Sequence, residues 1–353
     1  MTRWLFGIRV LAVPVLTAPV LVALVLVALV LVAPVLVAGC SSGTGSAALT
    51  SAAAPEQPDI TVAAIPAVDL AGLYIAQDRG LFARQGLHVT IVPVPSSQSV
   101  ISQQLAGQID ISAGSYVAYL AAQAAGARFR ILAEASTLAP DTRALVVTGN
   151  SRITMVSQLA GRTIGVNGVN SIGTLLVSAL LSAHGISPSA VKFVTDPDGF
   201  PAMPGKLQHG AWDAAFLAEP YITAAGQQYG QQVLADLDQG AVLSLPVDGY
   251  VATQAWARVH PATAAAFTRA IEQGQAIANN DISAVQAILA RHDQLPPAVT
   301  GSMAMPSSYP VGPVVEADVQ RVATAMLKFG VLSPRYATVV GQGTLVRSMV
   351  SPG

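Results

Sequence analysis

Short β-like runs alternate with helical runs from Ile60 onward, at intervals of about 20 residues. Residues 60–65 are apolar and β-branched, and Leu87, Val89 and Ile91 alternate with polar neighbours, as in a half-buried strand. Because parallel strands need crossover connections, this pattern predicts mostly parallel sheets with helices on both faces. The pattern restarts after Asn150, which predicts a second α/β unit. Further helices are expected at 261–278, 283–291 and 314–329.

Composition limits the class of protein. Of the 353 residues, 52% are hydrophobic and 10% are charged, and an uncharged apolar run, 10–37, holds much of that excess. A disordered chain or one with many membrane spans is therefore excluded. The formal net charge of -1 offers no basic surface for nucleic acid, and a single cysteine excludes a disulfide framework or a thiolate metal cluster.

The first 39 residues have the order of a secretory signal: Arg3 and Arg9, then the apolar run, then small residues. The sequence Val-Ala-Gly-Cys at 37–40 resembles a bacterial lipobox. That resemblance implies that Cys40 is lipidated and becomes the first mature residue, anchored to the cell membrane outside the cytoplasm. The alternative is an uncleaved membrane anchor, although the prolines within the apolar run disfavour a single continuous helix. Residues 40–58 are predicted to form a flexible tether.

Five sequence blocks, taken together, resemble one family. They are GLYIAQDRGLF with QGLHV at 72–89, LAGQIDI at 105–111, LAGRTIGV at 159–166, GAWDAA at 210–215 and EPY at 219–221. Their order is similar to that in the SsuA/NMT1-like substrate-binding proteins of ABC transporters. The resemblance implies a type II periplasmic-binding-protein fold, in which two α/β lobes joined by a two-segment hinge hold a small solute. It also implies an ABC permease with its ATPase as partners, a monomer, and no cofactor.

In that fold the chain crosses between lobes twice. We expect the first crossing near Ala144–Asn150 and the return near Pro246–Tyr250. Lobe one is then 59–147 with 248–345, and lobe two is 148–247. About 310 residues after the leader are enough for two such lobes.

Ligands of open α/β sheets lie beyond the carboxyl ends of the strands, where helices begin. Hydroxyl groups at helix starts favour an anion, which makes Ser97, Ser115, Ser171 and Thr174 candidates, although each would also serve as a helix cap. Four tyrosines are candidates to line the site and contact an apolar or ring-shaped ligand: Tyr74, Tyr116, Tyr221 and Tyr250. Each would otherwise be a core or rim residue. Asp69 and Glu219 favour a ligand that donates hydrogen bonds, or else they cap helices.

These features leave several functions open. The nitrate, sulfonate and taurine branch of the family fits the helix starts. The pyrimidine branch of the family usually has a histidine where this sequence has Leu70. This departure weakens the pyrimidine interpretation, so a pyrimidine ligand is the alternative to an anion. A sensor with the same fold is a further alternative. An enzyme is not supported, because Val169 replaces the first glycine of a Gly-x-Ser-x-Gly motif around Ser171, and the five histidines share no metal spacing.

Overall fold

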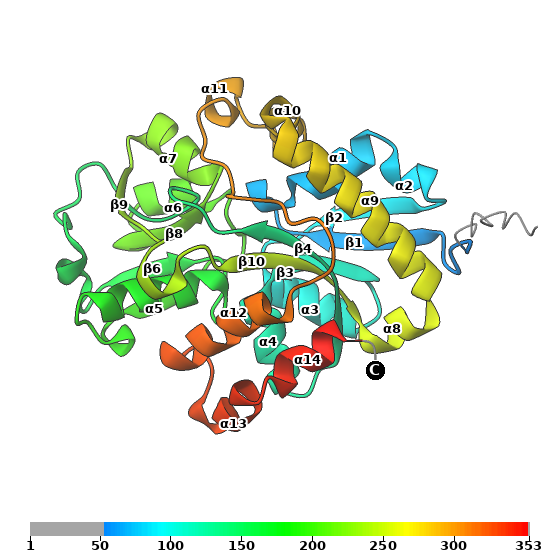
Figure 1. Ribbon diagram of the computed structural model, residues 1–353. Coiled ribbons are helices and arrows are strands. Elements are labelled where there is room, and N and C mark those ends of the chain that lie inside the picture. The colour runs from blue at the N-terminus through cyan, green and yellow to red at the C-terminus, as the bar shows by residue number, and fades with distance from the viewer. Residues whose placement is uncertain (1–52, 352–353) are drawn as a thin grey trace, which may run out of the picture. The chain divides into compact units, whose positions relative to one another are not determined.

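The computed structural model describes residues 53–351, so the leader, Cys40 and most of the predicted tether lie outside the described residues. The described chain contains two five-stranded sheets, ordered β2-β1-β3-β10-β4 and β7-β6-β8-β5-β9. This confirms two α/β lobes with helices around each sheet (Figure 1). Within this part of the chain, no helix is both long and apolar enough to span a membrane.

The first sheet is formed by both ends of the described chain. Its strands are β1 (Asp59–Ala64), β2 (His88–Pro93), β3 (Ile111–Ser115), β4 (Phe129–Thr137) and β10 (Pro246–Thr253). Strand β1 pairs in parallel with β2 and β3, whereas β10 lies antiparallel between β3 and β4. The connecting elements are η1 (Val68–Leu70), α1 (Ala71–Asp78), α2 (Leu81–Arg84), α3 (Ser97–Leu105) and α4 (Tyr116–Ala124).

The second sheet is formed by the middle of the chain. Its strands are β5 (Arg143–Val147), β6 (Thr163–Val166), β7 (Lys192–Thr195), β8 (Ala214–Ala218) and β9 (Gln232–Asp236). Strand β6 is parallel to β7 and β8, and β5 lies antiparallel between β8 and β9. The accompanying helical elements are η2 (Val156–Leu159), α5 (Ile172–Ala183), η3 (Pro188–Ala190), α6 (Met203–Gln208), α7 (Tyr221–Tyr229) and η4 (Gly240–Val242).

Both crossings differ from the expected positions. The first lies between Thr137 and Arg143, because the apolar run after Arg143 is a fully buried strand of the second sheet. The return lies between Asp236 and Pro246, so residues 246–250 already belong to β10 of the first sheet. Each crossing strand enters its new sheet against the direction of its neighbours. Both sheets are therefore mixed, where mostly parallel sheets were expected.

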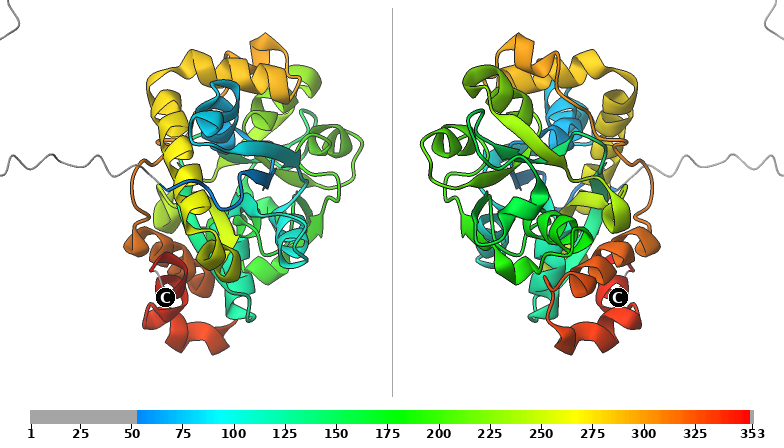
Figure 2. Two further views of the ribbon diagram at one scale, coloured as in Figure 1. Left: turned by 90° about the vertical axis from the view of Figure 1, so that its right-hand side faces the viewer. Right: turned by 90° about the vertical axis from the view of Figure 1, so that its left-hand side faces the viewer.

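The helical tail returns to the first lobe, as expected. It contains α8 (Gln254–Val259), α9 (Pro261–Asn280), α10 (Ile282–His292), α11 (Pro297–Thr300), α12 (Glu316–Lys328), η5 (Pro334–Tyr336), α13 (Ala337–Gly341) and α14 (Thr344–Val350). Successive side chains of a strand point to opposite faces, so Val62 packs in one apolar cluster with α1 and α9, and Ala63 packs in another with α4 and α12. Figures 1 and 2 show the yellow and the orange-red helices on these two faces.

Candidate functional site

The two lobes meet where the strands of both sheets end. The backbone N–H of Val68, after β1, donates to the carbonyl of Glu219, after β8, at 3.2 Å. At the start of α3, the amide of Gln98 donates to the carbonyls of Val169 and Asn170, which precede α5. We call this contact region the seam. In this conformation, residues of the chain itself bridge it.

The four candidate hydroxyl groups are buried at the seam and bonded to their own chain. Ser97 Oγ accepts from Ser115 N at 3.1 Å, and Ser115 Oγ accepts from Val117 N at 3.2 Å. In lobe two, Ser171 Oγ donates to the carbonyl of Gly168, and Thr174 Oγ1 donates to the carbonyl of Ser171 at 2.8 Å. The structure thus brings these hydroxyls together in two pairs, one in each lobe, and their hydrogen bonds join helix starts to loops. Their contact with a ligand stays a prediction.

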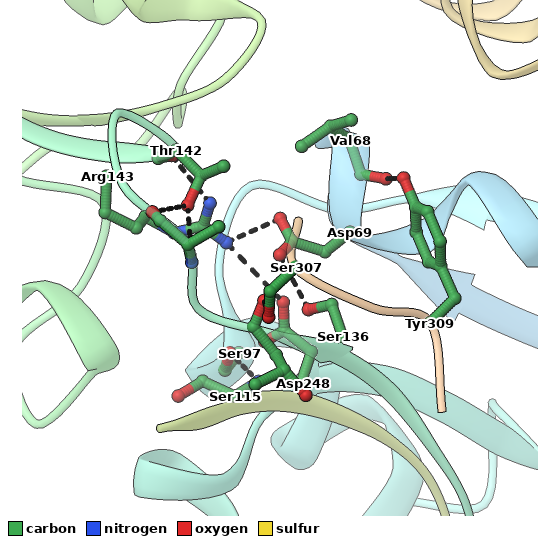
Figure 3. A network of polar contacts seen from close by, with 12 residues as sticks. Val68, Asp69, Ser97, Ser115, Ser136, Thr142, Arg143, Asp248, Ser307 and Tyr309 are labelled. Atoms are coloured by element: carbon green, nitrogen blue, oxygen red, sulfur yellow. Dashed lines mark hydrogen bonds and ion pairs between the residues drawn. The ribbon is translucent and has the colours of Figure 1, made fainter. Parts of the chain in front are cut away.

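Asp69 takes part in a buried ion cluster. Arg143, the first residue of β5, has only 2% of its side chain exposed, and its Nη2 lies 2.5 Å from Asp69 Oδ2 and 3.9 Å from Asp248 Oδ2. Ser136 Oγ donates to the other oxygen of Asp69 at 2.7 Å. Figure 3 shows the side chains of Arg143, Asp69 and Asp248 converging from β5, η1 and β10. Asp69 was expected to cap a helix or bind ligand, and in this conformation it binds Arg143, across the seam.

Burial raises the pKa of two carboxyl groups near Arg143, those of Asp248 and Glu219. Desolvation, together with the neighbouring charge of Asp69, raises the pKa of Asp248 to about 7, although Arg143 opposes this shift. Desolvation also raises the pKa of Glu219, against hydrogen bonds from Thr223 and from the backbone N–H of Ala304. Glu219 thus caps the first turn of α7, one of its two expected roles. Arg143 thus interacts electrostatically with three acidic groups: Asp69, Asp248 and Glu219.

Two of the candidate tyrosines belong to the core beside this cluster. Tyr116 and Tyr250 are fully buried, and the Tyr250 ring packs edge-on against Phe267 with centroids 5.7 Å apart. The Tyr116 hydroxyl has no hydrogen-bond partner among the described residues. A Cβ at position 249 would lie 2.6 Å from that hydroxyl, so glycine there leaves room for the ring. Their contact with a ligand also stays a prediction.

The other two tyrosines lie near an open cavity at the edge of the seam. Tyr74 of α1 lines a cavity of about 300 Å³. The other lining residues come from the segment after β1, from α1 and β2, and from the end of α10: Pro66, Gln77, Ile91, Pro93, His292 and Asp293. The Tyr74 ring lies over His292, with centroids 4.7 Å apart. Tyr221 of lobe two stacks on Phe200 with ring centroids 6.1 Å apart. Burial raises the pKa of Tyr221, and the charge of nearby Asp293 raises it further.

Sequence reasoning did not find Arg143, Asp248 or Asp293. Arg143 begins one apolar run that forms a strand, and Asp248 interrupts another. Both charges were detectable, since a strand buried on both faces rarely holds an unpaired charge. Asp293 had no such signal, because it follows a helix among polar residues. In the described part of the chain, no group of three or more histidine, cysteine, aspartate or glutamate side chains is placed to hold a metal ion.

Comparisons with known proteins agree with this architecture. The family model described as NMT1/THI5 like matches residues 67–281. The alkanesulfonate-binding protein SsuA of Xanthomonas axonopodis pv. citri, bound to MOPS, is 20% identical with a TM-score of 0.69, covering 79% of this chain and 95% of its own. The periplasmic nitrate-binding protein NrtA of Synechocystis PCC 6803 is 16% identical with a TM-score of 0.69, covering 84% and 89%.

An enzyme has the same fold. The desulfurization enzyme DSZB is 16% identical with a TM-score of 0.56, covering 83% of this chain and 99% of its own. No curated protein sequence matches the chain. The family match spans more than half of the 353 residues, and the solved structures share both lobes. The chain therefore belongs to the NMT1/THI5-like family and has the two-lobed fold of periplasmic binding proteins.

Proposed function

We propose that this protein captures a small polar solute between its two lobes and closes around it. It would do so outside the cytoplasm, anchored through Cys40, and pass the solute to an ABC permease and its ATPase. Family membership and the two-lobed fold support solute binding. Binding energy shared between two lobes favours their closed arrangement, which links capture to a change of shape.

The observation that carries the ligand class is a set of free acceptor atoms. Gln98 Oε1 and Asn167 Oδ1 at the seam, and Asp293 Oδ2 at its edge, are buried and have no hydrogen-bond partner among the described residues. Nitrate and sulfonate groups only accept hydrogen bonds, so they leave such atoms unpaired. A solute that donates hydrogen bonds fits better. The buried Nε of Arg143 and the hydroxyl of Tyr116 also lack partners among the described residues, and they are donors. The geometry therefore favours a solute that both donates and accepts hydrogen bonds, such as an aminopyrimidine or taurine, over nitrate.

A thermal-unfolding screen tests solute binding. The purified protein would be heated with nitrate, alkanesulfonates, taurine, aminopyrimidines and small amines in turn. A ligand at 100 times its dissociation constant stabilises the folded state by about 2.7 kcal/mol, which raises the unfolding temperature by several degrees. We expect a donor-bearing solute to give the largest shift. If none of these solutes raises the unfolding temperature, the proposed function is wrong.

The anchor and the transport step need separate tests. Radioactive palmitate should label the protein in bacterial cells, and Cys40→Ser should abolish the label. Uptake of the identified solute should fall in cells that lack this protein. If uptake is unchanged but a transcriptional response to the solute is lost, the sensor alternative is correct.

Catalysis has less support from the described geometry. The histidine side chains at 88, 184, 209 and 292 bond to Asp59, Leu180, Gly205 and Asp78, and the His260 ring packs on Trp256. None of these contacts activates a seam hydroxyl as a nucleophile. Incubation of the identified solute with the protein should return it unchanged.

A further inference from the structure

Asp293 is a carboxylate without a cation. It follows directly after Arg291 and His292, but both of those side chains bind Asp78 of α1, at 3.2 Å for His292 Nε2. Asp293 Oδ2 is buried, and neither a hydrogen bond nor an ion pair reaches the Asp293 side chain from the described residues. The Asp293 residue as a whole is part-buried, and a buried carboxylate oxygen without a partner costs free energy in the folded protein.

The cavity beside Asp293 has the size and lining of a ligand site. Its volume of about 300 Å³ is at the lower end for small-molecule pockets. Asp293 supplies a carboxylate, and His292, which lowers the pKa of Asp293 against the effect of burial, lies beside it. The remaining lining is aromatic, apolar or amide: Tyr74, Pro66, Pro93, Ile91 and Gln77. An aromatic ring and a carboxylate side by side attract a positively charged nitrogen, because both present negative potential.

The location connects this cavity to the seam. Pro66 lies two residues before Val68, whose backbone N–H bonds to Glu219 of lobe two. Tyr221 of lobe two lies near enough to Tyr74 and Asp293 that both raise its pKa. A group bound beside Asp293 therefore lies at the border of both lobes.

We propose that the cavity lined by Tyr74 and Asp293 is a subsite for a positively charged nitrogen group, a protonated amine or amidine, of the captured solute. This inference rests on the proposed function and names the chemistry of one end of its ligand. The Asp293 carboxylate forms an ion pair with the nitrogen of the solute. The Tyr74 ring packs against the apolar atoms of the solute next to that nitrogen.

Three probes of matched size test the subsite by titration calorimetry: benzylamine, benzyl alcohol and benzenesulfonate. At pH 7.5, benzylamine should bind at least about tenfold more tightly than the other two, because only it pairs with the carboxylate. Asp293→Asn should remove that preference, while Asp318→Asn, an exposed carboxylate on α12, should keep it. Tyr74→Leu should weaken benzylamine binding several-fold.

Several results would overturn the subsite. They are equal binding of benzyl alcohol and benzylamine, a preference for benzenesulfonate, no binding of any probe, or an unchanged benzylamine affinity in Asp293→Asn. The comparison of probes on the unmodified protein remains valid even if that variant does not fold. Failure here is distinguishable from failure of the proposed function: a solute found in the unfolding screen that binds equally to Asp293→Asn refutes the subsite alone.

Discussion

The ion cluster around Arg143 and the cavity at Asp293 use the same residue types in opposite ways. In the cluster, Asp69 is paired with Arg143 and with Ser136, and all three side chains are buried. In the cavity, burial raises the pKa of Asp293 to about 6, and the described chain supplies no partner. The first arrangement joins the lobes, and the second lines the cavity that we propose as a ligand subsite. The difference shows that partners, and not residue type, decide the role of a buried acid.

The largest effect is expected from removal of the cation. Arg143→Met leaves Asp69 buried without its partner and should lower the free energy of unfolding by about 3–5 kcal/mol. Urea unfolding at pH 7 measures this. The control is Arg162→Met, because Arg162 pairs with Asp213 on the surface and should contribute less than about 1 kcal/mol. Equal losses in both variants would show that the cluster does not differ from a surface ion pair.

The next effect concerns pH. Asp248 retains its proton in the folded protein up to about pH 7, whereas in the unfolded chain it loses the proton near pH 3.8. The folded state binds more protons between these values, so its stability falls as the pH rises through that window. The Asp248→Asn variant lacks this loss. The difference between its free energy of unfolding and that of the wild type should therefore rise by about 2 kcal/mol from pH 5 to pH 8. Urea unfolding at both values should show no such gain in the exposed-site variant Asp141→Asn.

Asp293→Asn should raise the free energy of unfolding, whereas Arg143→Met should lower it. The unpaired carboxylate is forced to ionise above pH 6, so its removal should raise the free energy of unfolding at pH 8 by about 1 kcal/mol. The gain should shrink at pH 5, where the acid is largely protonated. A loss of stability at pH 8 would mean that Asp293 has a structural partner, as Asp69 does.

The smallest effect on stability, below about 1 kcal/mol, is expected for Gln98→Ala, which removes the hydrogen bonds to Val169 and Asn170. Its main consequence should be a more open protein, seen as a larger radius of gyration in solution scattering. Gln103→Ala is the matched control, because Gln103 bonds to Ser99 within the same helix. Identical scattering from both variants would contradict a bridging role for Gln98.

Local patterns were sufficient for most of the fold. The alternation of β-like and helical runs located β1, β2 and the tail helices α9, α10 and α12, because hydrophobic periodicity and turn residues act over a few positions. The five family blocks predicted both lobes. The predicted positions of the two crossings differ from the observed ones. A strand buried on both faces, such as β5, lacks the alternation of apolar and polar residues that would distinguish it from a connecting segment.

The candidate site was less accessible from sequence. Glu219 was expected at a helix start and is found there, but Asp69 binds Arg143, 74 positions along the chain. Asp248 and Asp293 were missed.

The sequence by itself determined the family, the two α/β units and the helix starts that border the seam, because these depend on neighbouring residues. Only the tertiary structure decided which acids are paired and which remain free. Residues far apart in the sequence supply or withhold the counter-charge, and inside a protein a charge depends strongly on its immediate partners, since little water screens it.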